Sequence, residues 1–252
     1  MLFIIAVISL FSFATDKDTS EGPHVKSCND LKFSVKCDNL GSRQVSSKYG
    51  NKISNFLPEN YKWPNATVYY DFDGVFSHQE LHFIKQAMDQ ISANSCVLFL
   101  KKTNQAHHIE ITSEDSGCWA DTGYQSQKTQ VNFGPTCLAS LATPLHELMH
   151  TLGFLHQHTR PDRDQYIEIL YENVIQRPEI LFNFEIIEPW TELLFPLPYD
   201  YDSIMHYNAT MFSRDPEKLQ TIVPREPKIK PIGQRDHLSA FDIIAINLLY
   251  CL

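Results

Sequence analysis

Residues 146–156 read His-Glu-Leu-Met-His-Thr-Leu-Gly-Phe-Leu-His, which is the most informative stretch of the sequence. On a helix, residues four apart share a face, so His146 and His150 can bind one metal ion. Glu147 lies beside the first ligand, where it can act as a general base. Gly153 can adopt a positive φ and turn the chain back, so that His156 supplies a third imidazole. Three neutral imidazoles with an open fourth position predict a catalytic zinc site with one Zn²⁺ per chain.

The motif has a continuation and a downstream partner. Residues 154–164 read Phe-Leu-His-Gln-His-Thr-Arg-Pro-Asp-Arg-Asp, and residues 203–207 read Ser-Ile-Met-His-Tyr. Together they resemble the astacin family of metzincin endopeptidases, whose signature joins H-E-x-x-H-x-x-G-F-x-H-E-x-x-R-x-D-R-D to a later S-x-M-H-Y turn. The resemblance runs from about Lys62 to Cys251 and implies a secreted zinc endopeptidase that hydrolyses peptide bonds in proteins.

The family resemblance also implies a fold. We expect an α+β, two-lobed metzincin (zincin-like) catalytic domain with zinc at the floor of the cleft between the lobes. The N-terminal lobe should hold a twisted mixed sheet plus helices. The C-terminal lobe should be mostly irregular and end in a helix. In the family, the strand equivalent to residues 108–112 is a sheet edge that binds extended substrate, and edge pairing suits peptide recognition because it uses main-chain hydrogen bonds.

The resemblance assigns two catalytic residues. Glu147 takes a proton from water and returns it to the leaving amine. Tyr207 holds the position of the family tyrosine, a further zinc ligand that swings away to hydrogen-bond the transition state. Met205 should form an apolar floor beneath the zinc ligands, and His158 and His206 should not be ligands.

One position departs from the family pattern. The family usually has Glu directly after the third histidine, where it receives the ammonium of the processed N-terminus, and this chain has Gln157. A hydrogen bond to a charged group contributes roughly 1.5–3 kcal/mol, more than a neutral one. Our hypothesis is that the mature N-terminus is held differently here, or less tightly.

Six cysteines in a secreted chain indicate three disulfides, and spacing alone allows fifteen pairings. The resemblance selects Cys118 with Cys137 and Cys96 with Cys251. Cys28 and Cys37 remain, and we expect them to pair with each other.

The N-terminal quarter indicates export. Residues 2–14 carry no charge, are too few for a membrane span and end in a small-x-small cleavage pattern, so residues 1–14 are typical of a secretory signal peptide. We interpret residues 15–56 as a propeptide or N-terminal extension, and residues 57–252 as the peptidase domain. The net charge of −9 comes without a basic run, so no nucleic-acid partner is indicated. We expect a secreted, extracellular monomer that acts on protein or peptide substrates.

Local patterns predict several elements. Strands are expected at 67–72, 97–100, 108–112 and 130–133, with the adjacent histidines 107 and 108 at the surface. Ser77 with Glu80 forms a capping box for a helix over 77–94, and Ser239 with Asp242 begins the last helix. Thr143 should cap the zinc helix, which would run to about residue 152. We interpret Arg160, Asp162, Arg163 and Asp164 as a structural ion-pair cluster.

Two sequons, at Asn65 and Asn208, predict glycosylation, although a glycan at Asn208 would crowd Tyr207 beside it. Two alternatives to an active peptidase remain. A zinc-binding pseudoenzyme or latent zymogen would keep the fold without turnover, but a pure binder would not need Glu147. A structural zinc site would use four protein ligands, often cysteines, and the cysteines are committed elsewhere.

Overall fold

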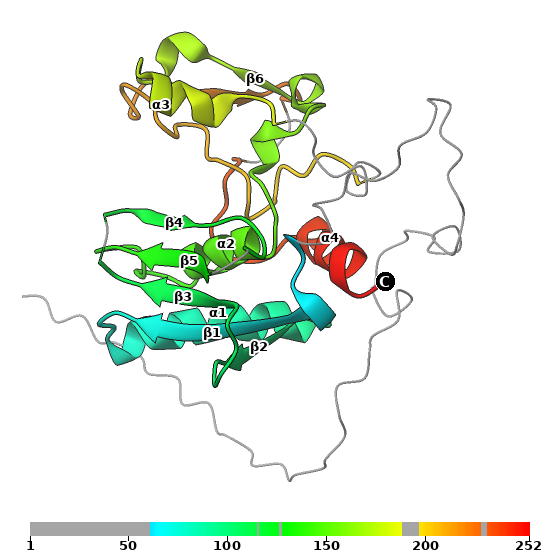
Figure 1. The fold of residues 1–252 in the computed structure, drawn as a ribbon. Helices are drawn as coiled ribbons and strands as arrows, with labels where there is room; N and C mark the ends of the chain where they lie inside the picture. The colour runs from blue at the N-terminus through cyan, green and yellow to red at the C-terminus, as the bar shows by residue number, and fades with distance from the viewer. Residues whose placement is uncertain (1–60, 115, 126–127, 188–196, 228–230) are drawn as a thin grey trace, which may run out of the picture. The chain divides into compact units, whose positions relative to one another are not determined.

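The computed structural model describes residues 61–252 except 115, 126–127, 188–196 and 228–230 (Figure 1). Every described residue belongs to one compact unit. The predicted signal peptide, the segment 15–56 and the Cys28–Cys37 pairing lie outside the described residues. No helix within the described residues is long and apolar enough to cross a membrane.

A five-stranded mixed sheet forms the N-terminal lobe, in the order β2-β1-β3-β5-β4. Its strands are β1 (Thr67–Asp73), β2 (Leu98–Lys101), β3 (His108–Thr112), β4 (Cys118–Ala120) and β5 (Lys128–Phe133). The pairs β1–β2, β1–β3 and β3–β5 are parallel, and only β4 runs antiparallel to its neighbour β5. All four predicted strands form, and β4 is an additional one.

This order corrects the prediction for residues 108–112. Strand β3 lies between β1 and β5 and is not an edge, and the two edges are β2 and β4. The predicted surface position of His108 is also wrong, because this residue is 3% exposed on a central strand. An extended peptide can therefore pair with β2 or β4 but not with β3.

Two helices cover the sheet. Helix α1 (His78–Asn94) has the predicted capping box between Ser77 and Glu80. Its apolar side chains fall on one face because they recur at helical spacing, and the buried ones are Ile84, Ala87, Met88 and Ile91. Helix α2 (Ala142–Thr151) packs against α1 and against strands β4 and β5.

The zinc helix begins two residues earlier than predicted. Its N-cap is Leu141, which has helical φ/ψ and no capping side-chain hydrogen bond, so Thr143 lies inside the first turn. Pro144 is still within the first turn, where a missing N–H costs no intrahelical hydrogen bond.

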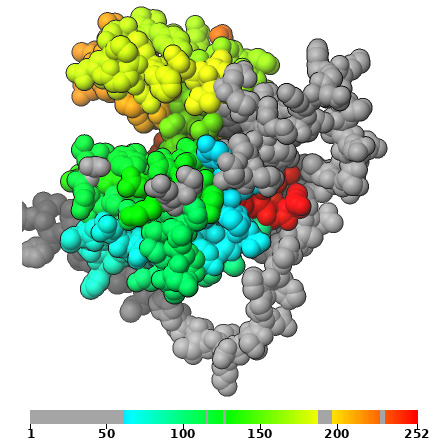
Figure 2. Space-filling view, in the orientation of Figure 1, coloured from blue at the N-terminus to red at the C-terminus, as the bar shows by residue number. Residues whose placement is uncertain are grey.

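Helix α4 (Ala240–Tyr250) closes the N-terminal lobe from the far end of the sequence. It begins with the predicted capping box between Ser239 and Asp242. Ala245, Ile246 and Leu249 join the core of the sheet, and the Tyr250 hydroxyl donates to the Leu152 carbonyl at 2.9 Å. Figure 2 shows α4, in red, beside the first described residues of the chain, in cyan.

The remaining elements belong to a C-terminal lobe with little regular structure. It contains β6 (Ile167–Ile169), β7 (Ile222–Pro224), the short helix α3 (Pro178–Leu181) and 3₁₀ turns at Gln157–Thr159, Arg163–Gln165, Tyr171–Asn173 and Phe182–Phe184. A further 3₁₀ turn, Pro64–Ala66, precedes β1. The lobe has its own core, whose buried members are Ile167, Val174, Phe184, Tyr199, Tyr207, Ile222 and Ile232. The α+β, two-lobed prediction is confirmed.

Both predicted disulfides are present. Cys96, after α1, is bonded to Cys251 at the end of α4, and Cys118 on β4 is bonded to Cys137. The ion-pair cluster is also present: Arg160 binds Asp162 at 2.8 Å and Arg163 binds Asp164 at 2.7 Å. Both guanidinium groups also donate to main-chain carbonyls of the C-terminal lobe, so their role is structural.

Candidate active site

Helix α2 carries His146 and His150 into the interior, and all its residues except Thr143 are buried. Gly153 follows the C-cap residue Leu152, and its φ of 98° lies in the left-handed region that glycine adopts without strain. The Gly153 N–H donates to the His150 carbonyl at 2.8 Å, which satisfies one of the helix's last carbonyls. The chain therefore reverses within one turn and brings His156 back to α2, as predicted.

The three imidazoles converge on one point. The Nε2 atom of His156 lies 3.2 Å from Nε2 of His146 and 3.2 Å from Nε2 of His150. Zinc binds histidine nitrogen at about 2.0–2.1 Å, so ligands of a tetrahedral ion lie about 3.3 Å apart. All three ligand atoms lie within 4.8 Å of one another, and within the described residues this is the one group of His, Cys, Asp and Glu side chains that could hold a metal ion. The donor set and its spacing fit zinc.

Main-chain carbonyls fix the tautomers of the first two ligands. Nδ1 of His146 lies 2.8 Å from the Ile204 carbonyl, and Nδ1 of His150 lies 2.7 Å from the Phe154 carbonyl. Because a carbonyl only accepts, each Nδ1 carries the proton and each Nε2 presents a lone pair to the common point. These hydrogen bonds also fix the orientation of both rings.

Burial keeps the ligands neutral. It lowers the pKa of His150 to about 4, and it lowers the pKa of both His146 and His156 well below the usual value, with the neighbouring imidazoles adding to the shift. Metal ions bind neutral imidazole, so at pH 7 the site requires no proton release from these rings.

Glu147 is 5% exposed and lies beside the first ligand on α2. Burial raises the pKa of its carboxyl to about 8, and the positive charge of Arg235 opposes that rise. A carboxyl with its pKa raised towards neutrality has the property that a general acid–base group needs. A dication bound next to it would favour the carboxylate and lower this pKa again.

Tyr207 is held against the third ligand. Its ring centroid lies 4.4 Å from that of His156 and 4.0 Å from that of His158. Burial raises the pKa of the phenol to about 12, so the hydroxyl keeps its proton at pH 7 and can donate a hydrogen bond.

The comparison with known families decides between the interpretations that this geometry allows. The family model described as Astacin, a peptidase family, matches residues 56–251. The chain belongs to the astacin family. It is a zinc-dependent metalloendopeptidase, a hydrolase that acts on protein substrates, and its three histidines form a zinc-binding triad.

Individual relatives agree with the family assignment. The chain is 36% identical over 195 residues to "Astacin-like metalloprotease toxin 2" of Loxosceles intermedia, covering 76% of this chain and 74% of the toxin. It is 37% identical over 198 residues to "Bone morphogenetic protein 1 homolog" of Strongylocentrotus purpuratus, of which it spans only 30%. Among solved structures, high choriolytic enzyme 1, a hatching enzyme zinc-protease from Oryzias latipes, superposes with a TM-score of 0.70 at 32% identity, covering 79% of this chain and 98% of that one.

One residue of the astacin-family site was missed from the sequence. A single nitrogen of Arg235, Nη1, donates to the carbonyls of Ile204 at 3.1 Å, His206 at 3.0 Å and Gln234 at 2.8 Å. Its positive charge also acts on Glu147 and Tyr207. No local pattern marks this arginine, because two of its three partners lie about thirty residues away in the sequence.

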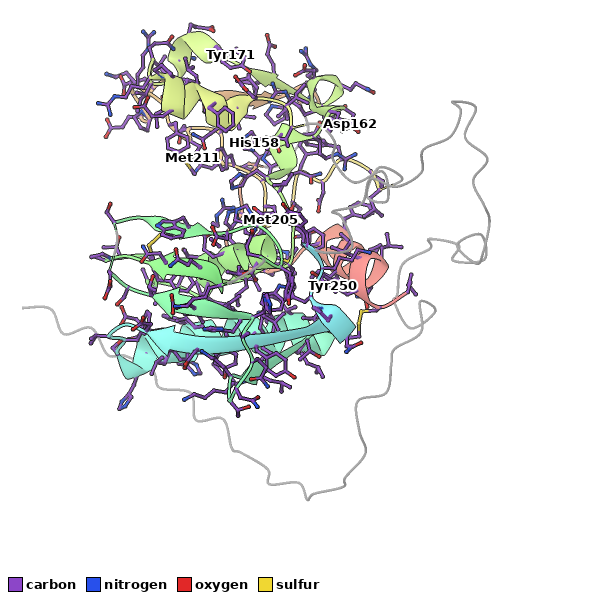
Figure 3. All side chains as sticks on the ribbon, viewed as in Figure 1. His158, Asp162, Tyr171, Met205, Met211 and Tyr250 are labelled. Atoms are coloured by element: carbon purple, nitrogen blue, oxygen red, sulfur yellow. A yellow bond between two sulfur atoms is a disulfide. The ribbon has the colours of Figure 1, made fainter. Side chains whose placement is uncertain are left out.

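The residues around the ligands agree with the prediction. Met205 is 2% exposed, belongs to the core of the N-terminal lobe and lies between α2 and His158 in Figure 3. His206 is hydrogen-bonded by Nδ1 to the Tyr207 carbonyl and by Nε2 to the Tyr199 hydroxyl. Neither His158 nor His206 joins the metal-binding group found among the described residues.

Proposed function

We propose that Glu147 is the general base and general acid of peptide hydrolysis in this astacin-family enzyme, with His146, His150 and His156 as the protein ligands of zinc. Zinc, when bound there, supplies a Lewis acid that activates water and polarises the scissile carbonyl. Glu147 accepts the proton of the attacking water and gives it to the nitrogen of the leaving amine. The observation that carries the proposal is a buried carboxyl with a raised pKa next to three converging imidazoles.

We assign Tyr207 to the transition state. Its neutral hydroxyl can donate a hydrogen bond to the oxygen that gains negative charge when the carbonyl is attacked. The packing of Tyr207 on His156 keeps the phenol beside the zinc ligands.

The test of the reaction class is cleavage of a denatured protein by the purified enzyme, after treatment with a chelator and again after zinc is restored. Cleavage that is lost with the chelator and recovered with zinc supports the proposal, and sequencing the products gives the cleavage sites. A chelator-resistant activity would contradict it. Full zinc binding without cleavage, in a chain from which residues 1–56 have been removed, would favour the pseudoenzyme.

The enzyme is proposed to be secreted and extracellular. Support comes from the uncharged residues 2–14, from the two disulfides, which form in oxidising compartments, and from relatives whose names describe a toxin and a hatching enzyme. In this proposal the signal peptide is residues 1–14, the propeptide or extension is residues 15–56 and the peptidase domain is residues 57–252. The enzyme works as a monomer and has no nucleic-acid partner. N-terminal sequencing of secreted material tests these boundaries.

Gln157 stands at the position where the family usually has the Glu that binds the ammonium of the processed N-terminus. Gln157 is 7% exposed and lines a small cavity of about 30 Å³ together with Arg160, Asp200 and Asp242. Burial raises the pKa of both carboxyl groups, that of Asp242 to about 6. A processed ammonium entering this cavity would therefore still meet acidic groups, although Gln157 itself is uncharged.

The variant Gln157→Glu tests this view of the N-terminus. We expect it to stabilise the processed enzyme through a charge-assisted hydrogen bond and to destabilise the unprocessed chain, where it adds a third buried acid. Thermal unfolding of both forms measures the difference. A processed wild-type structure with its first ammonium buried against Gln157 would show that the N-terminus is held as in the family.

A further inference from the structure

The sequon Asn65-Ala66-Thr67 lies in an exposed turn at the start of the described chain. Asn65 has φ 53° and ψ 30°, and it is exposed to solvent. The Thr67 hydroxyl donates to the Asn65 carbonyl at 3.1 Å, and no hydrogen bond involves the Asn65 side chain among the described residues. Asn is one of the few residues that adopt positive φ readily. The backbone conformation alone accounts for Asn at this position, but it does not account for the pocket beside Asn65.

A pocket of about 350 Å³ opens beside this turn, and Asn65 is one of its lining residues. Its walls include Trp63, Tyr69, Gln105, His107 and Tyr124. The Tyr124 ring packs edge-on against Trp63, with centroids 5.0 Å apart, and it stacks with His107, also at 5.0 Å. The volume lies in the range of about 300–1,000 Å³ typical of small-molecule sites, and so does the mixture of aromatic walls with a few polar groups.

These walls suit a sugar. A pyranose ring has an apolar face of C–H groups that packs on aromatic rings, and an acetamido group that hydrogen-bonds with amides such as Gln105. We propose that Asn65 carries an N-linked glycan whose first N-acetylglucosamine lies in this pocket. The proposal rests on the proposed secretion, because the sugar is added in the secretory pathway.

The modification is a group transfer from a lipid-linked oligosaccharide diphosphate. The Asn65 amide nitrogen forms a bond to C1 of the first sugar, the bond from C1 to the phosphate oxygen breaks, and the nitrogen loses one proton. The lipid diphosphate leaves. No oxidant or reductant is needed.

The second sequon is not equivalent. The Asn208 side-chain oxygen accepts from the Thr210 N–H at 3.0 Å, and a Cβ on Gly233 would lie 2.3 Å from the Asn208 Cα, so the side chain of this exposed residue is already hydrogen-bonded and the Gly233 backbone passes close to it. A glycan at Asn208 would also lie next to Tyr207. The structure therefore favours Asn65 as the modified site.

Occupancy is tested by expressing the chain in a secreting eukaryotic host and measuring the mass of the peptide that contains Asn65. Thr67→Ser keeps the sequon, and the nearly isosteric Thr67→Val removes it. We expect a glycan in the wild type and in Thr67→Ser, and none in Thr67→Val or Asn65→Gly, which keeps the left-handed backbone. A secreted wild type with unmodified Asn65 would overturn this proposal alone, whereas a chain that is not secreted would instead contradict the proposed secretion.

Docking of the first sugar needs a second measurement. An endoglycosidase that leaves one N-acetylglucosamine should leave the Tm unchanged. Thr67→Val also loses the hydroxyl hydrogen bond to the Asn65 carbonyl, so the two variants are compared both with glycosylation and with glycosylation blocked. The Tm of Thr67→Val should lie below that of Thr67→Ser by about 2–4 °C more when glycosylation is allowed, a modest shift for a domain of this size. Tyr69→Ala should lower the Tm more in the glycosylated Thr67→Ser background than in bare Thr67→Val, because one pocket wall then loses its sugar contact. Equal shifts in both backgrounds would show that the sugar lies outside the pocket.

Discussion

The ring of His158 stacks on the ring of Tyr207, with centroids 4.0 Å apart and planes 28° from parallel. His158 is fully buried, and its Nε2 donates to the Asn183 carbonyl at 2.9 Å. Its Nδ1 has no hydrogen-bond partner among the described residues. Packing and one hydrogen bond therefore hold His158, and His158 in turn supports the phenol proposed to act on the transition state.

Replacing His158 should affect turnover through Tyr207. In His158→Phe the ring remains and the stack persists, so kcat should stay close to that of the wild type. In His158→Ala the unfolding free energy should fall by about 2–4 kcal/mol because a cavity forms, and kcat should fall while KM changes little. In a Tyr207→Phe background, His158→Ala should lower kcat no further. An additive loss would show that His158 does not act through Tyr207.

Arg235 should affect both the shape and the charge of the site. Arg235→Lys keeps the charge but loses the planar guanidinium that reaches the carbonyls of Ile204 and His206, so it should lower stability and leave the pH profile in place. Arg235→Met also removes the charge that lowers the pKa of Glu147. The acidic limb of the kcat/KM profile should therefore move to higher pH in Arg235→Met only. Identical profiles in both variants would exclude this electrostatic role.

Asp242 should act on zinc affinity from a distance. Its carboxylate accepts from the Ser203 hydroxyl at 2.7 Å and the Ile204 N–H at 2.9 Å, and the Ile204 carbonyl orients His146. In Asp242→Asn, an NH₂ group replaces one acceptor, which should cost about 2–3 kcal/mol of stability. Zinc affinity, measured by competition with a chelator, should fall about 10–100-fold. Unchanged affinity in a folded variant would separate this carboxylate from the zinc site.

Glu147 should make the metal-free enzyme less stable as pH rises. Burial raises the folded pKa to about 8 from the usual value of 4.5, so the folded state holds a proton that the unfolded state releases. This contribution is greatest below about pH 4.5 and is lost as pH rises through about 8. Buried histidines whose pKa is lowered have the opposite effect, because they destabilise the folded state as pH falls below their usual pKa of about 6.5. The difference between wild type and Glu147→Gln, from denaturant unfolding without zinc, isolates the carboxyl, and no difference in slope between pH 5 and 8 would contradict its raised pKa.

Local sequence patterns predicted the parts of the fold that are built locally. Ser77 with Glu80 and Ser239 with Asp242 are capping boxes within single turns, and both helices begin there. Gly153 places the third ligand within eleven residues of the first. The beginning of α2 was missed because Leu141 carries no capping side chain, so Thr143 gave the stronger but incorrect signal.

The features that the sequence did not predict correctly depend on contacts between residues far apart in the chain. The three-residue strand β4 is too short for a pattern, and β3 is not an edge because it pairs with β1 on one side and with β5 on the other. The position of Arg235 depends on the carbonyls of Ile204 and His206, across a turn that sequence spacing does not describe. The core of the C-terminal lobe joins aromatic residues from separate loops, and no period marks them.

The most direct test of the account is a comparison of wild type, Glu147→Gln and Glu147→Ala, with zinc content and cleavage of the same peptide measured on each preparation. The account predicts one zinc per chain in all three, because Glu147 is not a ligand, and a fall in kcat of at least about 100-fold in both variants. A variant that keeps its zinc and cleaves at the wild-type rate would contradict the proposed role of Glu147.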